Sequence, residues 1–349
     1  MNEKTPVNLK DERLIHMLKK PKILVVGSFM MDLISSAPRV PNMGETVTGF
    51  DFRTAPGGKG SNQAIQCARL GADVTMVGCV GDDAFGKELL ASSAASGVDV
   101  SKVKISAERA TGVADIQLQV TETGAQNRIL IVPGANYDLR PEDLEWLRDG
   151  IKEYDLLMLQ LEIGMETTCF AAACAKAAGV PVMLNPAPAA PMPAELLACA
   201  TWLSPNEHEA ALLAGKPPIR ADENGVDHED LSAVAAALRE KGVEKVMITL
   251  GGNGSVVCSA DGIRSTACVR MPEVKDPTAA GDSFVASFCT GVTAGLPESE
   301  ALAFASHAAA ITVSRMGAAP SLPTLAEVQE LLRERKYAGF DPAELDVLK

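Results

Sequence analysis

The chain has 349 residues, 47% of them hydrophobic and 22% charged, with a formal net charge of −13 and a pI near 4.9. This composition is typical of a folded globular protein, and the acidic balance argues against a nucleic-acid partner, because phosphate backbones are bound by clustered Lys and Arg. No apolar run approaches the roughly 18 residues of a membrane-spanning helix, so we expect no membrane partner. The eight cysteines include no C-x-x-C pair, which favours reduced thiols in a cytoplasmic protein.

Residues 1–20 carry scattered charges and no continuous apolar segment, and we interpret them as an N-terminal extension. Beyond them, apolar runs bounded by glycines alternate with segments of helical periodicity. Near-continuous apolar strands joined by helices predict an α/β fold over residues 21–349, with a doubly wound, mostly parallel sheet flanked by helices. The expected strands are 23–26, 74–80, 156–161, 180–184 and 246–250, and the first expected helix is 61–70.

Two stretches, 45–53 and 112–132, instead alternate apolar and polar residues, as strands with one solvated face do. We interpret them as a small β lid that protrudes beside the main domain and includes segments of about 36–57 and 110–133. Such a lid could cover a ligand or meet another subunit. The simpler alternative is an extra surface hairpin.

A segment that suits phosphoryl-transfer chemistry runs from Asp276 to Phe284. Small residues at a helix start leave backbone N–H groups open to an anion, and we expect Ala279, Ala280 and Gly281 to form such an anion hole. Asp282 beside it could take the proton of an attacking hydroxyl. Taken alone, Asp282 could equally be an acid that only stabilises its helix.

A second cluster, residues 56–63, places Lys59 and Asn62 in a glycine-rich loop before a helix, which suits a polyhydroxy ligand. It is not a Walker A loop, because G-x-x-x-x-G-K-[ST] would require Gly at Arg53 and Ser or Thr at Gly60. A flexible glycine turn is the alternative. Asp32 and Glu162 each follow a predicted strand and could accept hydrogen bonds from sugar hydroxyls, although either could be an ordinary loop acid.

The glycines of residues 249–254 follow another apolar strand, at the edge where α/β sheets bind ligands, and could hold a nucleotide. A plain hairpin turn explains them nearly as well. Asn206 and Glu209 could orient a hydrated Mg²⁺ through oxygen ligands, or they could be a helix cap and a solvated acid.

Together these segments resemble the ribokinase family of carbohydrate kinases, from about Lys22 to Ser321. The resemblance implies transfer of the ATP γ-phosphoryl group to the 5-hydroxyl of D-ribose, with Mg²⁺ and with activation by a monovalent cation, usually K⁺. It also implies a homodimer formed through the lid. Seven motifs occur in the family's order, at 57–63, 160–162, 185–189, 206–209, 249–251, 279–282 and 317–321.

The same resemblance implies site residues, carried over position by position. Asp282 would be the base, next to the anion hole around Gly281. The sugar would be held by Asp32, Gly58, Lys59, Asn62 and Glu162. ATP would contact Asn206, the turn that contains Thr249, Gly251 and Gly254, and Ser306. The cation would lie on Asp276, Thr278, Thr312, Arg315, Gly317 and Ser321, mostly through backbone carbonyls.

Three positions depart from the family pattern. Met30 stands where bacterial members of the family carry Asn, and a thioether cannot donate to a sugar hydroxyl. This resembles 2-deoxyribose kinases, so a 2-deoxyribose 5-kinase is an alternative to a ribose kinase. Pro277 removes an N–H group beside the cation loop, and Ser306 stands where the family has His or Asn near the adenine. An alternative of another class is a non-catalytic sugar-binding regulator.

Overall fold

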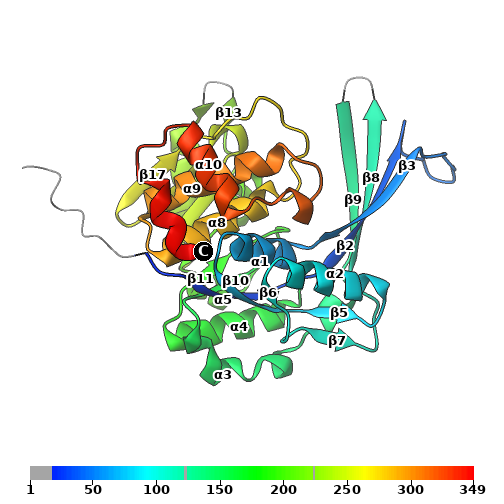
Figure 1. Ribbon diagram of the computed structural model, residues 1–349, viewed down its shortest axis with the longest axis horizontal. Coiled ribbons are helices and arrows are strands. Elements are labelled where there is room, and N and C mark those ends of the chain that lie inside the picture. Colours follow the sequence, from blue (N-terminus) through cyan, green and yellow to red (C-terminus); the bar gives the residue numbers. More distant parts are fainter. Residues whose placement is uncertain (1–17, 122–123, 223–224) are drawn as a thin grey trace, which may run out of the picture.

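The structure is a computed structural model that describes residues 18–121, 124–222 and 225–349. Its centre is a nine-stranded sheet with the strand order β17-β16-β15-β12-β11-β10-β1-β4-β6 (Figure 1). Neighbouring strands are parallel from β6 to β15, and β16 and β17 continue the sheet as antiparallel strands. The strands are β1 (Lys22–Val26), β4 (Asp73–Val77), β6 (Val98–Asp99), β10 (Leu156–Leu159), β11 (Val182–Leu184), β12 (Trp202–Leu203), β15 (Lys245–Thr249), β16 (Ser255–Ser259) and β17 (Gly262–Thr266).

Helices cover both faces of this sheet, and the side chains of successive strand residues pack alternately into two separate apolar cores. On β1, Ile23 and Val25 pack in one core while Leu24 and Val26 pack in the other, because strand side chains alternate between faces. The first core includes residues of α1 (Lys59–Arg69), α2 (Ala84–Ala95), α8 (Ala280–Ala294), α9 (Glu298–Val313) and α10 (Leu325–Glu334). The second includes residues of α3 (Leu147–Gly150), α4 (Met165–Ala178), α5 (Ala194–Cys199), α6 (Glu207–Ala214) and α7 (His228–Glu240). The doubly wound α/β prediction is confirmed.

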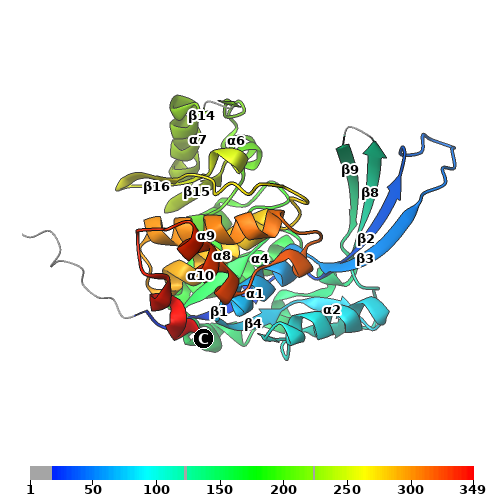
Figure 2. The same cartoon turned by 45° about the horizontal axis from the view of Figure 1, so that its top comes forward.

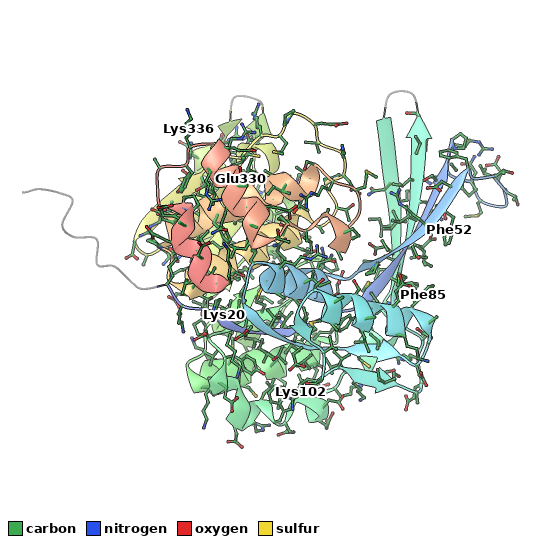
Figure 3. The ribbon with its side chains drawn as sticks, viewed as in Figure 1. Lys20, Phe52, Phe85, Lys102, Glu330 and Lys336 are labelled. Atoms are coloured by element: carbon green, nitrogen blue, oxygen red, sulfur yellow. The ribbon has the colours of Figure 1, made fainter. Side chains whose placement is uncertain are left out.

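A four-stranded sheet of order β3-β2-β8-β9 stands away from this body in two views of the molecule (Figures 1 and 2). Its strands are β2 (Met30–Ala37), β3 (Asp51–Gly57), β8 (Val113–Thr121) and β9 (Gly124–Val132). We call these four strands the lid. The exposed side chain of Phe52 lies on it (Figure 3). The structure therefore has a protruding sheet where the sequence predicted one, but residues 45–50 form no strand and β2 belongs to it.

Of the predicted extension 1–20, residues 1–17 lie outside the described residues. Within the described ranges, no helix combines the length and apolar character needed to cross a membrane.

The remaining elements are short. The other strands are β5 (Cys79–Gly81) with β7 (Lys104–Ser106), and β13 (Ala221–Asp222) with β14 (Gly225–Val226). The 3-10 helices are η1 (Gly134–Asp138), η2 (Pro141–Leu144), η3 (Ile151–Glu153), η4 (Gly251–Asn253), η5 (Ala319–Ser321) and η6 (Pro342–Leu348).

Candidate active site

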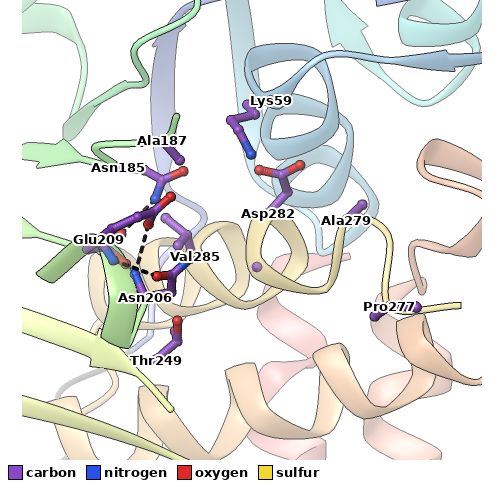
Figure 4. A pocket seen from close by; sticks show the side chains of 12 residues that line it. Lys59, Asn185, Ala187, Asn206, Glu209, Thr249, Pro277, Ala279, Asp282 and Val285 are labelled. Atoms are coloured by element: carbon purple, nitrogen blue, oxygen red, sulfur yellow. Dashed lines mark hydrogen bonds between the residues drawn. The ribbon is translucent and has the colours of Figure 1, made fainter. Parts of the chain in front are cut away.

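A cavity of about 220 Å³ lies at the carboxyl ends of the parallel strands, where open α/β sheets bind ligands. The segments that follow β11 and β12 and the last residue of β15 reach it, and the N-termini of α1, α6 and α8 close around it (Figure 4). It is therefore built from parts of the chain that are far apart in sequence. The lining residues are Lys59, Asn185, Ala187, Ser204, Asn206, Glu209, Thr249, Pro277, Ala279, Gly281, Asp282 and Val285.

Asp282 lies in the first turn of α8 and is buried, with both carboxylate oxygens held by amides from α1. Asn62 donates its side-chain N–H to Oδ2 over 2.9 Å, and Gln63 donates to Oδ1 over 3.1 Å. The amino group of Lys59 points toward the same carboxylate (Figure 4). A fixed carboxylate beside an ammonium group is an arrangement that can accept a proton from a bound hydroxyl.

The start of α8 has the features of an anion site. Ala279, the N-cap, has φ +60°, a left-handed conformation that few non-glycine residues adopt, and it turns the chain sharply into the helix. The predicted open N–H of Ala280 is engaged within the protein, because it donates to the carbonyl of Pro277 where the chain turns into the helix. Beyond its chain neighbours and its own helix backbone, nothing lies within 4 Å of the position that a Cβ would take at Gly281. An anion can therefore approach the backbone there, at the positive end of the helix dipole.

The glycine-rich loop before α1 packs against the segment that joins β1 to β2. At Gly57 a Cβ would lie 2.7 Å from a carboxylate oxygen of Asp32. At Gly58, which has φ +94°, it would lie 2.7 Å from the backbone N of Met30. The absence of side chains at these glycines thus brings Asp32 and Met30 next to Lys59 at the same end of the site.

Glu162 ties this loop to the end of β10. Its Oε2 accepts a hydrogen bond from the hydroxyl of Ser28 over 2.5 Å and another from the backbone N–H of Lys59 over 2.9 Å. Burial raises the pKa of Glu162, although Lys59 and Ser28 act in the opposite direction. The carboxylate is thereby fixed beside the predicted sugar loop.

Four carboxyl groups lie close enough to Lys59 to interact with its charge. Burial raises the pKa of Asp32 to about 7, and the charges of Glu162 and Asp282 act in the same direction. Burial alone would lower the pKa of Lys59, but the charges of Asp282, Glu162, Glu209 and Asp32 outweigh it, so the pKa of Lys59 is raised. Lys59 therefore stays positively charged, and the carboxyl groups around it can accept hydrogen bonds from sugar hydroxyls.

A set of buried amides next to Asp282 was not assigned a role from the sequence. Gln63 donates to Asn185 over 3.0 Å and accepts a hydrogen bond from Gln160 over 2.7 Å. These residues lie in the motifs 57–63, 160–162 and 185–189, but a motif alone does not show which of its residues are buried. The sequence feature that could have identified them is an amide side chain among apolar residues of a helix or strand, because a buried amide needs hydrogen-bond partners.

The predicted nucleotide residues divide into two groups. Thr249, Asn206 and Glu209 line the cavity. Asn206 and Glu209 also cap α6, because Asn206 Oδ1 accepts from the N–H of Glu209 and Glu209 Oε2 accepts from the N–H of Asn206. Gly251 and Gly254 lie in and after η4, beyond the cavity lining. Ser306 is also outside the lining and joins α9 to the segment after β17, through Ala267 and Val269.

The structure brings the two segments predicted to hold a cation together. Asp276 accepts hydrogen bonds from the N–H groups of Thr278 and Gly317, each over 2.9 Å. Burial would raise the pKa of Asp276, but these hydrogen bonds outweigh it and the pKa is lowered.

The side chains on the second of these segments are engaged within the protein. The Thr312 hydroxyl donates to the Ala308 carbonyl, the Ser321 hydroxyl donates to the Ala318 carbonyl, and Arg315 pairs with Glu327. The donating hydroxyl oxygens keep free lone pairs, so a cation here could be held by backbone carbonyls, by these hydroxyls and by the Asp276 carboxylate.

Comparison with known proteins identifies relatives of this arrangement. The pfkB family carbohydrate kinase domain matches residues 20–325. A ribokinase of Schizosaccharomyces pombe is 42% identical over 313 residues, which cover 88% of this chain and 96% of that relative. A deoxyribokinase of Salmonella typhi is 33% identical over 312 residues, which cover 89% of this chain and 98% of that relative.

Solved structures agree in fold. The structure of Arabidopsis thaliana ribokinase complexed with ribose and ATP superimposes with a TM-score of 0.81 at 35% identity, covering 90% of this chain and 99% of that one. The predicted carbohydrate-kinase class is confirmed. The chain belongs to the pfkB family of carbohydrate kinases.

Proposed function

We propose that this chain is an ATP-dependent ribokinase that transfers the γ-phosphoryl group of ATP to the 5-hydroxyl of D-ribose, giving ribose 5-phosphate. The observation that carries the proposal is the single cavity in which Asp282, the open backbone at Gly281 and the Lys59 ammonium converge. A relative named ribokinase, 42% identical over most of the chain, supports the sugar. A protein that only bound sugar would need neither the base nor the anion hole.

In the proposed reaction, Asp282 takes the proton of the 5-hydroxyl as that oxygen forms its bond to the γ-phosphorus. The bond between the γ-phosphorus and the oxygen that bridges to the β-phosphorus breaks, and ADP leaves with the electron pair. The N–H groups around Gly281 and the charge of Lys59 stabilise the negative charge on the transferred group. Asp32, Asn62 and Glu162 hold the sugar so that its 5-hydroxyl faces Asp282.

Mg²⁺ would neutralise part of the phosphate charge during transfer. Among residues 18–121, 124–222 and 225–349, no three His, Cys, Asp or Glu side chains gather as a metal-binding group. This fits an ion that keeps most of its water and the phosphates as ligands. Asn206 and Glu209 would orient that water from the cavity wall while they cap α6.

A monovalent cation, K⁺ in the first instance, would lie between the segments at Asp276–Thr278 and Thr312–Ser321. The hydrogen bond from Gly317 to Asp276 supports the pairing of these segments. The cation would strengthen the positive potential at the adjacent start of α8. Ribose-dependent ADP formation with K⁺ and with Na⁺ distinguishes activation from simple salt effects.

The acceptor sugar is ribose in our primary proposal, with 2-deoxyribose as a second candidate that Met30 favours. Met30 and Asp32 are two residues apart on β2, so both side chains face the same side of the lid. Met30 is only 2% exposed, yet it belongs to neither apolar core among the described residues, as expected for a side chain that borders a ligand site. A relative named deoxyribokinase shares 33% identity.

Met30→Asn should therefore raise the ratio of kcat/KM for ribose to that for 2-deoxyribose, because an amide can bond the 2-hydroxyl and a thioether cannot. A gain of roughly 10-fold corresponds to one hydrogen bond. Met31→Asn is not a suitable control, because Met31 belongs to the core; Met30→Leu is, since it keeps the site apolar. An unchanged ratio in Met30→Asn would remove Met30 from sugar selection.

The role of Asp282 is tested with Asp282→Asn. The amide keeps the shape of the side chain and cannot take a proton, so kcat should fall by roughly 100- to 10,000-fold while ATP still binds. Coupled ADP detection measures the rate, and nucleotide titration checks binding. Turnover near the wild-type value would contradict the proposal, and ribose binding without ADP formation by the unaltered chain would favour a sugar-binding regulator.

We also propose a cytoplasmic location and a homodimer formed through the lid. All eight cysteines are free thiols, which supports a reducing compartment. Exposed apolar side chains on the lid support the dimer.

A further inference from the structure

Gln63 lies directly behind the proposed base. It is on α1, which packs against α8, and its side chain is 0% exposed. Its amide Nε2 donates to Asp282 Oδ1 over 3.1 Å and to Asn185 Oδ1 over 3.0 Å. Gln63 does not line the cavity and so touches Asp282 only from the protein side.

The hydrogen-bond network fixes which end of the Gln63 amide faces Asp282. The backbone carbonyl of Ser204 can only accept, so Asn185 must present its N–H₂ to it, over 2.6 Å. Asn185 Oδ1 then faces Gln63 and requires a donor there. Gln160 Nε2 donates to Gln63 Oε1 over 2.7 Å from the other side. Reversing the Gln63 amide would break these hydrogen bonds.

We propose that Gln63 is a positioning residue that sets the rotation of the Asp282 carboxylate, so that Oδ2 is the atom that receives the sugar proton. Oδ1 is tied to Gln63 behind the site. Oδ2 is bonded to Asn62, whose own Oδ1 is buried without a hydrogen-bond partner among the described residues. The free Asn62 Oδ1 and Asp282 Oδ2 are both acceptors, so a sugar hydroxyl that reaches this point would donate its proton toward one of them, and the charged Oδ2 is the stronger base. This role rests on the proposed function of Asp282.

The physical basis is the broad torsion of a carboxylate about its last bond, which has no strong intrinsic minimum. Without Gln63, Asp282 would sample orientations in which neither oxygen faces the hydroxyl. Misplacement of a catalytic group by a fraction of an ångström to 1 Å can cost up to about 100-fold in rate. The loss should appear in kcat, because Gln63 does not contact either substrate.

Gln63→Met removes the donor and keeps the length of the side chain. We expect kcat to fall on the order of 10- to 100-fold, with KM for ribose and for ATP within about twofold of the wild type. Gln66→Met is the matched control. Gln66 is also 0% exposed on α1, bonds Pro323 and Ser283 rather than Asp282, and its loss should lower stability with little effect on kcat.

A double-mutant cycle separates positioning from a general structural effect. In an Asp282→Asn background no base is left to orient, so adding Gln63→Met should change the residual rate by less than about twofold. If Gln63→Met lowered the rate equally in both backgrounds, or lowered kcat no more than Gln66→Met, Gln63 would be structural only. If Asp282→Asn itself kept full turnover, the proposed function would fail first, which the single variant reveals independently.

Discussion

At the scale of single residues, the buried carboxyl group of Asp32, which we propose binds the sugar, lowers the free energy of unfolding as the pH rises. Its pKa rises from 3.8 to about 7 on burial, so between these pH values the folded state binds a proton that the unfolded chain does not. The stability linked to this proton is complete below about pH 4 and is lost as the pH rises through 7. Between pH 5 and 8 the loss amounts to roughly 2–3 kcal/mol of unfolding free energy.

Asp32→Asn should remove that dependence, because the amide is neutral in both states. Its Tm should exceed that of the wild type slightly at pH 5 and by several degrees more at pH 8, while ribose binding is lost. Thermal unfolding in the absence of sugar at both pH values measures the difference. Asp261→Asn, in the exposed turn between β16 and β17, removes the same charge as a control; equal Tm shifts in both variants at pH 8 would contradict the linkage.

The residues of the site could be predicted where they belong to an ordered motif. Lys59 and Asp282, which come from two such motifs, share one cavity, and Asn62 bonds to Asp282. The role of Gln63 could not be predicted, because it depends on burial and on partners 97 and 122 residues away. For Asn206 the structure shows the helix cap that the sequence left as an alternative, together with a place in the cavity wall.

At the scale of elements, the sequence predicted best the strands that are covered on both faces. β10 is apolar along its whole length and β1 is apolar after Lys22, because helices bury each side of the main sheet. β2 was not recognised as a lid strand, since its first residues are buried at the base of the lid and lack the expected alternation. β12 has only two residues, too few for any periodicity, and exists through its parallel pairing with β11 and β15. Such pairings are long-range and leave little local signal.

At the scale of the whole molecule, strand register decides which surface another subunit would meet. Asp32, Ile34 and Met30 share one face of β2, and Ile34 pairs with Ile116, which pairs with Ile129. The lid face that carries Asp32 is therefore also an apolar row across three strands. Ile129 is 53% exposed at its end, whereas the exposed Phe52 pairs with Ser35 and so lies on the other face of the lid. An exposed apolar area of this kind marks an interaction site, and in the proposed homodimer a second copy of the chain would cover it.

Ile129→Lys should therefore dissociate the proposed homodimer, because a charge on the apolar row would be buried without a partner at the interface. We expect the dimer dissociation constant to rise by at least about 10- to 100-fold, measured by sedimentation equilibrium. Leu130→Lys is the control: the neighbouring residue is 64% exposed, but its side chain faces the other side of the lid. Equal dissociation by both variants, or a monomeric wild type, would contradict this interface, and a dimer unaffected by Ile129→Lys would place the contact elsewhere on the molecule.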